Sequence, residues 1–338
     1  MGRGARGPSM HDVAAMAGVS HQTVSRVLNG FEGIRPETRE RVLAAIDRLG
    51  YRRNLAARSL ATGRTGVVGV LAPDNPTYGA TSGLYGVEHA VREAGLQPLI
   101  TTTSGLPESV ESALEFLYGR AAEALVIMAP TRSVLEVHDR MGTEVPTAYL
   151  LTGAERGRWS VCTDQAKGAE LAMQALLDAG HTAIQHVRGP LDSTEAQLRS
   201  DAYSRFMAQH SLARLPILEG DWSPQSGFDA YLRLDPRATA VFCANDQMAI
   251  GVIHAAYVGG RWVPDDLSVV GFDDIPEAAH TLPPLTTVRQ DFRGVGSLAV
   301  SLLTAALDGE EPPVVEPLMP ELIARDSVGP PGERKRSW

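Results

Sequence analysis

Five polar residues within one short segment have side chains of the kind that proteins use to contact DNA. They are His21, Gln22, Ser25, Arg26 and Asn29. Amide and guanidinium groups can form paired hydrogen bonds with base edges, hydroxyl groups can bind phosphates, and none of the five residues is acidic. The segment therefore carries a chemistry that suits nucleic acid.

The residues around this polar face predict two short helices joined by a tight turn. The expected apolar faces consist of Val13, Ala14, Ala17 and of Val24, Val27, Leu28. Gly18 can adopt a positive φ at the corner, Val19 can fill the angle, and Ser20 can cap the second helix. This pattern favours a helix-turn-helix over residues 10–30. A plain helical hairpin with a solvated polar face fits the same residues, so the rest of the chain must decide.

A third helix is expected after the loop from Phe31 to Arg35. Pro36 suits its first position and Gly50 can end it. Its apolar residues recur at helical spacing and are Val42, Leu43, Ile46 and Leu49. We therefore expect a compact three-helix headpiece. The next segment, LAARSLATGRTG, has room for a two-turn helix that is too short to be stable alone, so we expect a linker that orders only when docked.

Composition and charge limit the class of protein. The chain has 338 residues, 43% hydrophobic and 21% charged, which suits a globular protein of two or three domains. No apolar run could span a membrane and no signal peptide is evident, so we expect a cytoplasmic protein. Cys162 and Cys243 lie in separate apolar runs, which favours buried reduced thiols over a disulfide or a metal site.

The net charge is unevenly distributed. The whole chain carries −9, but residues 1–64 contain 11 Arg, no Lys and 5 acidic residues, a local charge of +6. A basic segment on an acidic body is the pattern expected of a DNA-binding domain attached to a domain with another task.

From Gly66 onward, apolar runs alternate with helical periods. The predicted buried strands are VVGVLAP, ALVIMAP, TAYLL, AIQHVRG, TAVFCAND and LSVVGFDD. The predicted helices between them include Leu84 to Ala94, Ser109 to Leu117, Lys167 to Ala179 and Asp246 to Tyr257. This alternation predicts an α/β fold with parallel sheets in two similar lobes, with a ligand cleft at the carboxyl ends of the strands. The Pro/Gly-rich and basic tail at 329–338 is expected to be disordered.

Several motifs in order make the chain resemble the LacI/GalR family of bacterial transcriptional repressors over residues 10–328. They are DVAAMAGVSHQTVSRVLN, NLAARSLATGRTGVVGV, HTAIQHVRGP, GDWSPQSGF, AVFCANDQMAIGV, LSVVGFDDI and PPLTTVRQDF. The resemblance implies a headpiece that binds a pseudo-palindromic operator and a two-lobed, periplasmic-binding-protein-like core that forms a homodimer.

The resemblance also implies domain boundaries. We expect a headpiece at 1–53, a hinge helix and linker at 54–65, and an effector-binding core at 66–328. Within the core, the N-lobe would comprise 66–163 and 293–321, and the C-lobe 164–292 and 322–328. The chain would cross between the lobes near Thr163, Phe292 and Leu322.

By position in the headpiece motif, His21, Gln22 and Arg26 are the expected base contacts. Gln22 suits adenine and Arg26 suits guanine. The remaining expected DNA contacts, mostly to phosphates, are Ser20, Thr23, Ser25, Asn29, Thr38, Tyr51, Asn54 and Ala57. Leu60 matches the family's hinge leucine, which wedges between base steps in the minor groove. The alternative is that Leu60 only packs within a linker helix.

The effector contacts that the resemblance implies come from separate motifs in the core. They are Leu150, Arg199, Trp222, Asn245, Asp273, Gln290 and Phe292. Sugars need such a mixture, because hydroxyl groups pair with Arg, Asn and Asp, and a pyranose ring stacks on an aromatic side chain such as Trp222. Trp222 could instead be a core residue. Asp246 and Asp274, which follow Asn245 and Asp273 in the chain, are expected to cap helices.

The expected pocket departs from the family pattern in two places. Leu151 stands where the resemblance would place an aspartate, and Pro73 where it would place a serine. Glu195 is a candidate for a replacement polar contact. We therefore expect a sugar or glycoside that relieves repression, with no cofactor, while a purine-type corepressor is disfavoured by the GDW motif.

Two other classes of protein remain to be compared. A solute-binding transport protein would share the two-lobed fold but would have no use for residues 10–64. A sugar-converting enzyme would need a nucleophile elbow, a P-loop or metal-ligand spacing, and none is present in the sequence.

Overall fold

The computed structural model describes residues 8–28, 30–52, 63–74, 77–128, 131–142, 144–150 and 154–332, although not the side chains of 154–156. The chain divides into two compact units, Met1–Thr65 and Gly66–Trp338. We describe each unit by itself.

The first unit is a three-helix headpiece. Its helices are α1 (Met10–Ala17), α2 (His21–Leu28) and α3 (Pro36–Leu49). Ser9 and Asp12 form a capping box at the start of α1, and Gly18 ends this helix with φ 64°. The predicted helix-turn-helix and third helix are confirmed.

The headpiece core is apolar and consists of Val13, Ala14, Ala17, Val24, Val27, Val42, Ala45 and Tyr51. Leu43 was expected in this core, but it is 48% exposed and Ala45 is buried instead. The spacing of α3 brings 42, 45, 46 and 49 to one face, whereas residue 43 is turned about 100° away from 42.

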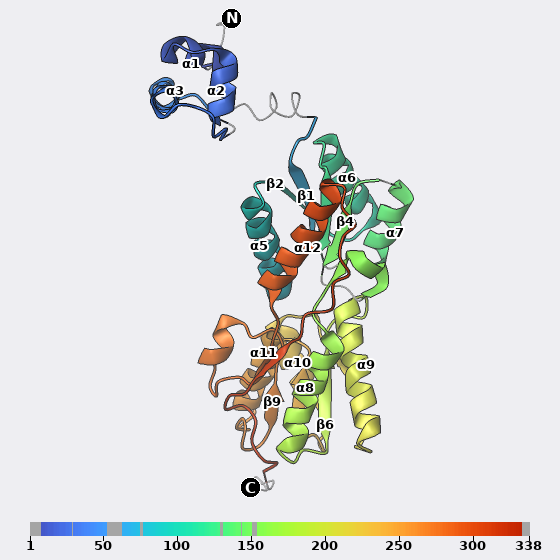
Figure 1. The fold of residues 1–338 in the computed structure, drawn as a ribbon. Helices are drawn as coiled ribbons and strands as arrows, with labels where there is room; N and C mark the ends of the chain where they lie inside the picture. The colour runs from blue at the N-terminus through green and yellow to red at the C-terminus, as the bar shows by residue number, and fades with distance from the viewer. Residues whose placement is uncertain are drawn as a thin grey trace, which may run out of the picture. The chain divides into compact units, whose positions relative to one another are not determined.

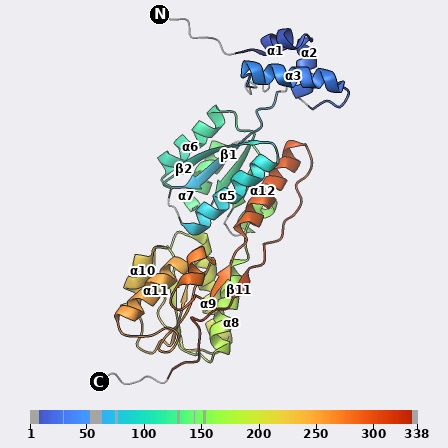
Figure 2. The ribbon, with the colours of Figure 1, turned by 90° about the vertical axis from the view of Figure 1, so that its left-hand side faces the viewer.

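The second unit consists of two lobes, one above the other in Figure 1 and Figure 2. The N-lobe has a parallel five-stranded sheet in the order β2-β1-β3-β4-β5. Its strands are β1 (Val67–Pro73), β2 (Gln97–Thr103), β3 (Ala124–Met128), β4 (Thr147–Leu150) and β5 (Ser160–Val161). Its helices are α5 (Tyr78–Glu93), α6 (Pro107–Gly119), α7 (Arg132–Met141), η1 (Ala154–Trp159) and α12 (Phe292–Leu307).

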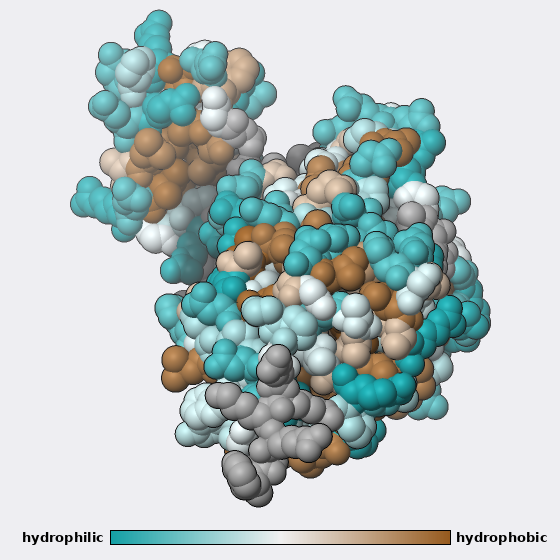
Figure 3. Space-filling view, turned by 90° about the horizontal axis from the view of Figure 1, so that it is seen from below, coloured by the Kyte–Doolittle hydropathy of each residue, from teal (hydrophilic) through white to brown (hydrophobic). Residues whose placement is uncertain are grey.

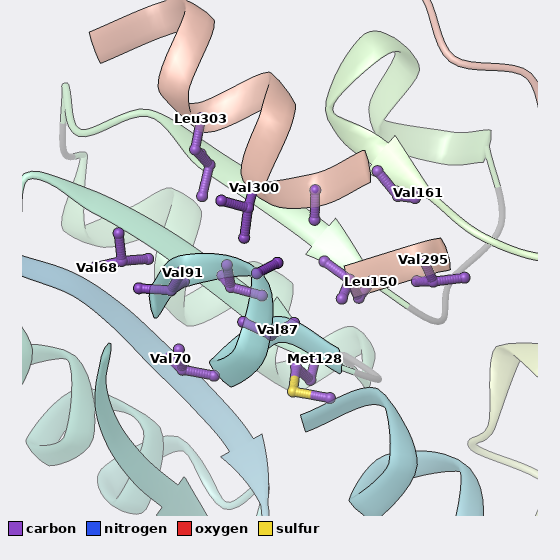
Figure 4. Close-up of a cluster of buried hydrophobic side chains, with 14 of the residues drawn as sticks. Val68, Val70, Val87, Val91, Met128, Leu150, Val161, Val295, Val300 and Leu303 are labelled. Atoms are coloured by element: carbon purple, nitrogen blue, oxygen red, sulfur yellow. The ribbon is translucent and has the colours of Figure 1, made fainter. Parts of the chain in front are cut away.

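Helices cover both faces of the N-lobe sheet. On one face, α5 and α12 lie side by side, and Figure 4 shows Val87 and Val91 of α5 together with Val300 and Leu303 of α12 over the strands. On the other face, α6 and α7 bury Leu114, Leu117 and Val137. Burial on both faces explains why the strands are continuous apolar runs.

The C-lobe repeats this plan with a four-stranded parallel sheet in the order β7-β6-β8-β9. Its strands are β6 (Ile184–Arg188), β7 (Leu218–Glu219), β8 (Ala240–Cys243) and β9 (Ser268–Val270). Its helices are α8 (Gln165–Asp178), α9 (Thr194–Gln209), α10 (Pro224–Tyr231), α11 (Asp246–Val258) and η2 (Pro276–His280). Helices α10 and α11 pack on one face, and α8 and α9 on the other.

Three chain segments connect the lobes. The first passes through Thr163, which bridges to Leu318 on the third segment. The second leaves β10 (Thr287–Arg289), which pairs in antiparallel fashion with β11 (Glu321–Ile323). Because α12 starts at Phe292 and this side chain packs in the N-lobe core, the second crossing lies just before Phe292.

The part of the tail that the structure describes is ordered, contrary to expectation. Gly329 N donates to Ser268 Oγ at 3.0 Å, and the Gly329 carbonyl lies 2.9 Å from His181 Nε2. These contacts join Gly329, the first residue of the tail, to the C-lobe, while 333–338 lie outside the described residues. Cys162 and Cys243 are buried free thiols, as predicted, and burial raises the pKa of Cys162 to about 11.

The surface seen in Figure 3 is mainly hydrophilic, with separate apolar areas on each unit. Among the described headpiece residues, Met16, Phe31 and Leu43 are the exposed large apolar side chains. No described helix combines the length and the hydrophobicity that crossing a bilayer requires.

Candidate functional site

The polar face of α2 is the candidate DNA-contacting surface. His21, Gln22 and Arg26 are exposed, as a base contact requires. His21 stacks against His11 with ring centroids 4.7 Å apart, and the Arg26 guanidinium lies 5.4 Å from the Phe31 ring centre. These ring contacts position the side chains of His21 and Arg26 but do not occupy all of their hydrogen-bonding groups.

Other predicted DNA contacts have structural duties in the headpiece. Ser20 Oγ accepts from Thr23 N at 3.1 Å and lies 2.9 Å from Thr23 Oγ1, so the predicted cap of α2 is confirmed. Thr38 is half-buried in the first turn of α3. Tyr51 is 9% exposed and belongs to the apolar core, so packing is the contribution visible for its ring. Ser25 is half-buried on α2.

The predicted hinge residues and one residue of the turn lie outside the described residues. They are Asn29, Asn54, Ala57 and Leu60. Their assignment to DNA contacts therefore stays a prediction from the sequence.

A cavity of about 420 Å³ lies between the two lobes and is the candidate effector site. The residues that line it include Pro73, Asp74, Thr103, Ser104, Met128, Asp192, Glu195, Arg199, Asp221, Trp222, Asn245, Asp273, Gln290 and Phe292. Six of the seven predicted effector contacts are thus brought together from helices α9 and α12 and from the segments that follow β7, β8, β9 and β10. The cavity lies at the carboxyl ends of β1, β3, β6 and β8, where parallel sheets place ligands.

One group of interacting polar side chains forms the polar floor of the cavity, with Arg199 at its centre. Its members are Gln165, Glu195, Arg199, Asp273 and Gln290. Arg199 is 2% exposed, its Nε donates to Gln165 Oε1 at 2.8 Å, and its Nη1 donates to the Ala244 carbonyl. Its Nη2 lies 3.9 Å from both Glu195 Oε1 and Asp273 Oδ1. The guanidinium group is therefore held in one orientation between two carboxylates.

Gln165 was not among the predicted site residues, yet its side chain forms hydrogen bonds with three other residues of the polar floor. Its Nε2 donates to Gln290 Oε1 at 2.8 Å and to Glu195 Oε1 at 3.2 Å. Gln290 in turn donates to Asp273 Oδ1 at 2.7 Å. Gln165 is the first residue of α8, two residues before the predicted start of this helix at Lys167, and no sequence signal distinguishes such a glutamine from a solvated one.

Burial changes the protonation of both floor carboxyls. Desolvation raises the pKa of Glu195 to about 7, with Arg199 opposing this shift and Asp273 adding to it. Desolvation also raises the pKa of Asp273 to about 6, against the effects of Arg199 and Gln290. Near neutral pH these two carboxyls can therefore exchange protons with solvent or with a ligand.

The aromatic wall of the cavity is positioned by close backbone contact. Trp222 has φ 74° and its ring lies over Gly189, where a Cβ would come within 2.4 Å of the indole. Asp273 also has a positive φ, 109°. Backbone strain of this kind in non-glycine residues is common at binding sites. Phe292 lies opposite and meets Tyr78 edge to face at 5.8 Å.

The expected helix caps near the cavity are wrong. Asn245, not Asp246, caps α11, because its Oδ1 accepts from Met248 N at 2.9 Å. Asp246 is fully buried and accepts from Thr287 Oγ1 and Ile275 N. Asp274 forms ion pairs with Arg289 at 2.8 Å and with a second arginine on the C-terminal segment. The members predicted to face the cavity, Asn245 and Asp273, do line it, and Asp246 and Asp274 do not.

Leu150 must be removed from the effector set. It is fully buried and lies among core residues of the N-lobe such as Val161 and Val295, as Figure 4 shows. It does not line the cavity. Pro73 does line the cavity, as the family pattern implied for that position, while Leu151 lies outside the described residues.

Two family models match the chain. The model for bacterial regulatory proteins of the lacI family matches residues 9–54, and a periplasmic binding protein-like domain matches residues 173–328. The first match covers the three-helix headpiece, and the second covers most of the C-lobe together with α12.

Relatives of known class match almost the whole chain. An HTH-type transcriptional repressor PurR from Vibrio parahaemolyticus is 32% identical over 95% of this chain and 98% of its own. The ribose operon repressor of Escherichia coli K12 is 35% identical over 87% of this chain and 92% of its own. Among solved structures, a lac repressor dimer bound to operator and the anti-inducer ONPF is 29% identical, with a TM-score of 0.87 over 96% of this chain and 100% of that chain.

Proposed function

Because the chain belongs to the lacI family of bacterial regulatory proteins, we propose that it is a transcriptional repressor whose operator binding is relieved by a sugar or glycoside bound between the lobes. The observation that carries this proposal is the cavity of about 420 Å³, in which Arg199, Asp273 and Trp222 converge.

The headpiece supports the DNA-binding part of the proposal. We assign residues 1–53 to operator binding, 54–65 to a hinge and 66–328 to the effector-binding core. Exposed His21, Gln22 and Arg26 on α2 would contact base edges in the major groove, and Leu60 would enter the minor groove. The solved relative bound to operator supports the same use of a matching headpiece.

The cavity supports a polyhydroxylated effector. Arg199, Asn245, Asp273 and the hydroxyl groups of Thr103 and Ser104 offer both donors and acceptors. The Trp222 ring offers an apolar face for a sugar ring. The relative that represses a ribose operon is consistent with a sugar-linked function.

A second candidate is a corepressor or other non-sugar effector, such as a purine. It is favoured by the similarity to a repressor named PurR over 95% of the chain. A planar heterocycle would stack on the same Trp222 and use the same Asn245 and Asp273. The direction of the response separates the candidates, since an inducer lowers operator affinity and a corepressor raises it.

We further propose that the protein acts as a cytoplasmic homodimer without catalytic activity. A two-fold assembly would match a pseudo-palindromic operator, and the solved relative is a dimer. The family's other named members here are repressors, which supports a binding function and not turnover.

The deciding experiment measures binding of fluorescent operator-like DNA fragments to the full chain by anisotropy, with and without a panel of monosaccharides, disaccharides and purines. We expect one sugar to lower operator affinity at least about tenfold, which is about 1.4 kcal/mol of coupling. A rise in affinity with a purine and no response to any sugar would establish the second candidate. Absence of DNA binding with intact folding would reject both.

A further inference from the structure

We propose that the cavity between the lobes selects effectors that carry no phosphate or carboxylate group, and so excludes sugar phosphates and sugar acids. This inference rests on the proposed function, because it specifies the chemical class of compound that binds at the same site.

Acidic side chains outnumber basic ones around the cavity. Its lining carboxylates are Asp74, Asp192, Glu195, Asp221 and Asp273. Arg199 is the one basic residue among the described lining residues. The two undescribed segments that adjoin lining residues in sequence, 75–76 and 129–130, contain no Lys or Arg. The described lining therefore presents more acidic than basic groups to a ligand, with the exposed Asp74, Asp192 and Asp221 as its negative groups.

The single arginine is already engaged by the protein. Its guanidinium donates to Gln165 and to the Ala244 carbonyl, and its face lies 3.8 Å from the Phe272 ring centre. Its remaining nitrogen lies between the carboxylates of Glu195 and Asp273. A phosphate group could pair with Arg199 only in place of these two carboxyl groups, each of which would then lose its cationic partner.

The entrance adds a second barrier. Asp74 follows β1 in the N-lobe and Asp192 precedes α9 in the C-lobe, so both lobes place an exposed carboxylate at the cavity. Like charges held in a concave site repel an incoming anion more strongly than charges on a flat surface. An uncharged polyol meets no such barrier, because it carries no charge for these carboxylates to repel.

The test compares matched pairs of compounds by isothermal titration calorimetry on the full chain. Each of ribose, glucose and galactose is paired with its terminal phosphate and with its acid, adenine is paired with AMP, and inorganic phosphate is included as a bare anion. We expect the phosphate or acid of the best uncharged ligand to bind at least about a hundredfold more weakly. Inorganic phosphate should show no binding below about 1 mM.

The double variant Asp74→Asn, Asp192→Asn tests the cause. We expect it to tighten binding of the phosphorylated partner at least about tenfold and to change the uncharged ligand less than about threefold. Asp201→Asn is the matched control, because Asp201 is an exposed acid on α9, the helix that follows Asp192, and it does not line the cavity. The control should change neither affinity.

The outcomes separate this inference from the proposed function. A phosphorylated compound or inorganic phosphate that binds as tightly as its uncharged partner overturns the inference even if operator release is intact. Binding of adenine with exclusion of AMP, and no sugar binding, overturns the sugar proposal and leaves the inference standing. A double variant that still excludes phosphates contradicts the assigned role of Asp74 and Asp192.

Discussion

The Gln165 side-chain amide donates to Gln290 Oε1 at 2.8 Å, and so connects two of the three chain segments that join the lobes. Gln165 follows the first crossing and Gln290 lies on the second. The same glutamine holds Arg199 and Glu195, which line the cavity. A ligand that touches Arg199, Glu195 or Gln290 therefore contacts a residue hydrogen-bonded to Gln165, next to the first crossing between the lobes.

Replacing Gln165 should weaken effector binding, because its side chain links the cavity residues Arg199 and Glu195 to Gln290. Gln165→Leu removes three hydrogen bonds and leaves buried polar groups of Arg199 and Gln290 without partners, at about 1–3 kcal/mol for such a group. We expect effector affinity to fall about tenfold or more in calorimetry, with operator affinity in the absence of effector unchanged. Gln174→Leu, an exposed position on the same helix, is the control. Unchanged effector binding in Gln165→Leu would refute a positioning role.

Gly189 should be essential for the aromatic wall. Gly189→Ala places a Cβ within 2.4 Å of the Trp222 ring, so the ring must move out of its present position. We expect weaker effector binding and a shifted tryptophan fluorescence signal on ligand addition. Gly119→Ala is the control, because a Cβ there meets nothing within 4 Å. If Gly189→Ala binds effector normally, stacking on Trp222 in this orientation is not required.

The free energy of unfolding of the core should depend on pH through the protonation of Glu195. Burial raises its pKa in the folded state to about 7, above the ordinary value of 4.5 for a glutamate, so protonation favours the folded state. This stabilisation is complete below about pH 4.5 and is lost as pH rises to about 7, with a slope of at most about 1.4 kcal/mol per pH unit. Urea unfolding of Glu195→Gln between pH 5 and 8 should lack this loss. Parallel pH profiles for both proteins would contradict it.

Arg26→Ala should reduce operator discrimination. Its exposed guanidinium on α2 suits a guanine, so its loss should cost about 1–3 kcal/mol and relax preference at one base pair. Arg48→Ala, exposed at the end of α3, should leave that preference intact. The measurement is anisotropy on operator variants with single base-pair changes. If Arg26→Ala weakens binding to all operator variants equally, Arg26 contacts a phosphate and not a base.

Leu60→Ala should weaken operator binding without altering the core. As a wedge between base steps, Leu60 would stabilise bent DNA, and its truncation removes the contacts that offset the cost of unstacking. Leu282→Ala, 90% exposed in the C-lobe, is the control. Thermal unfolding of the core should be the same in both variants. Equal operator affinity in Leu60→Ala and the wild type would show that the residue only packs within the hinge.

The sequence by itself determined the elements whose signals are local. The six predicted strands, the turn at Gly18, the cap at Ser20 and the start of α3 at Pro36 are confirmed. Strands buried on both faces, helix caps and positive-φ glycines depend on residues within a few positions of one another, so a single sequence contains them. The motif order also placed six effector residues that line one cavity.

Only the tertiary structure decided which side chains face the cavity and what holds them. Leu150 and Tyr149 are neighbours on one strand but belong to the cores on opposite faces of the N-lobe sheet, and neither lines the cavity. Gln165 meets Gln290 across 125 residues of chain, which no local pattern records. Such contacts depend on how separate elements pack, because side-chain direction and long-range pairing are fixed only when the lobes assemble.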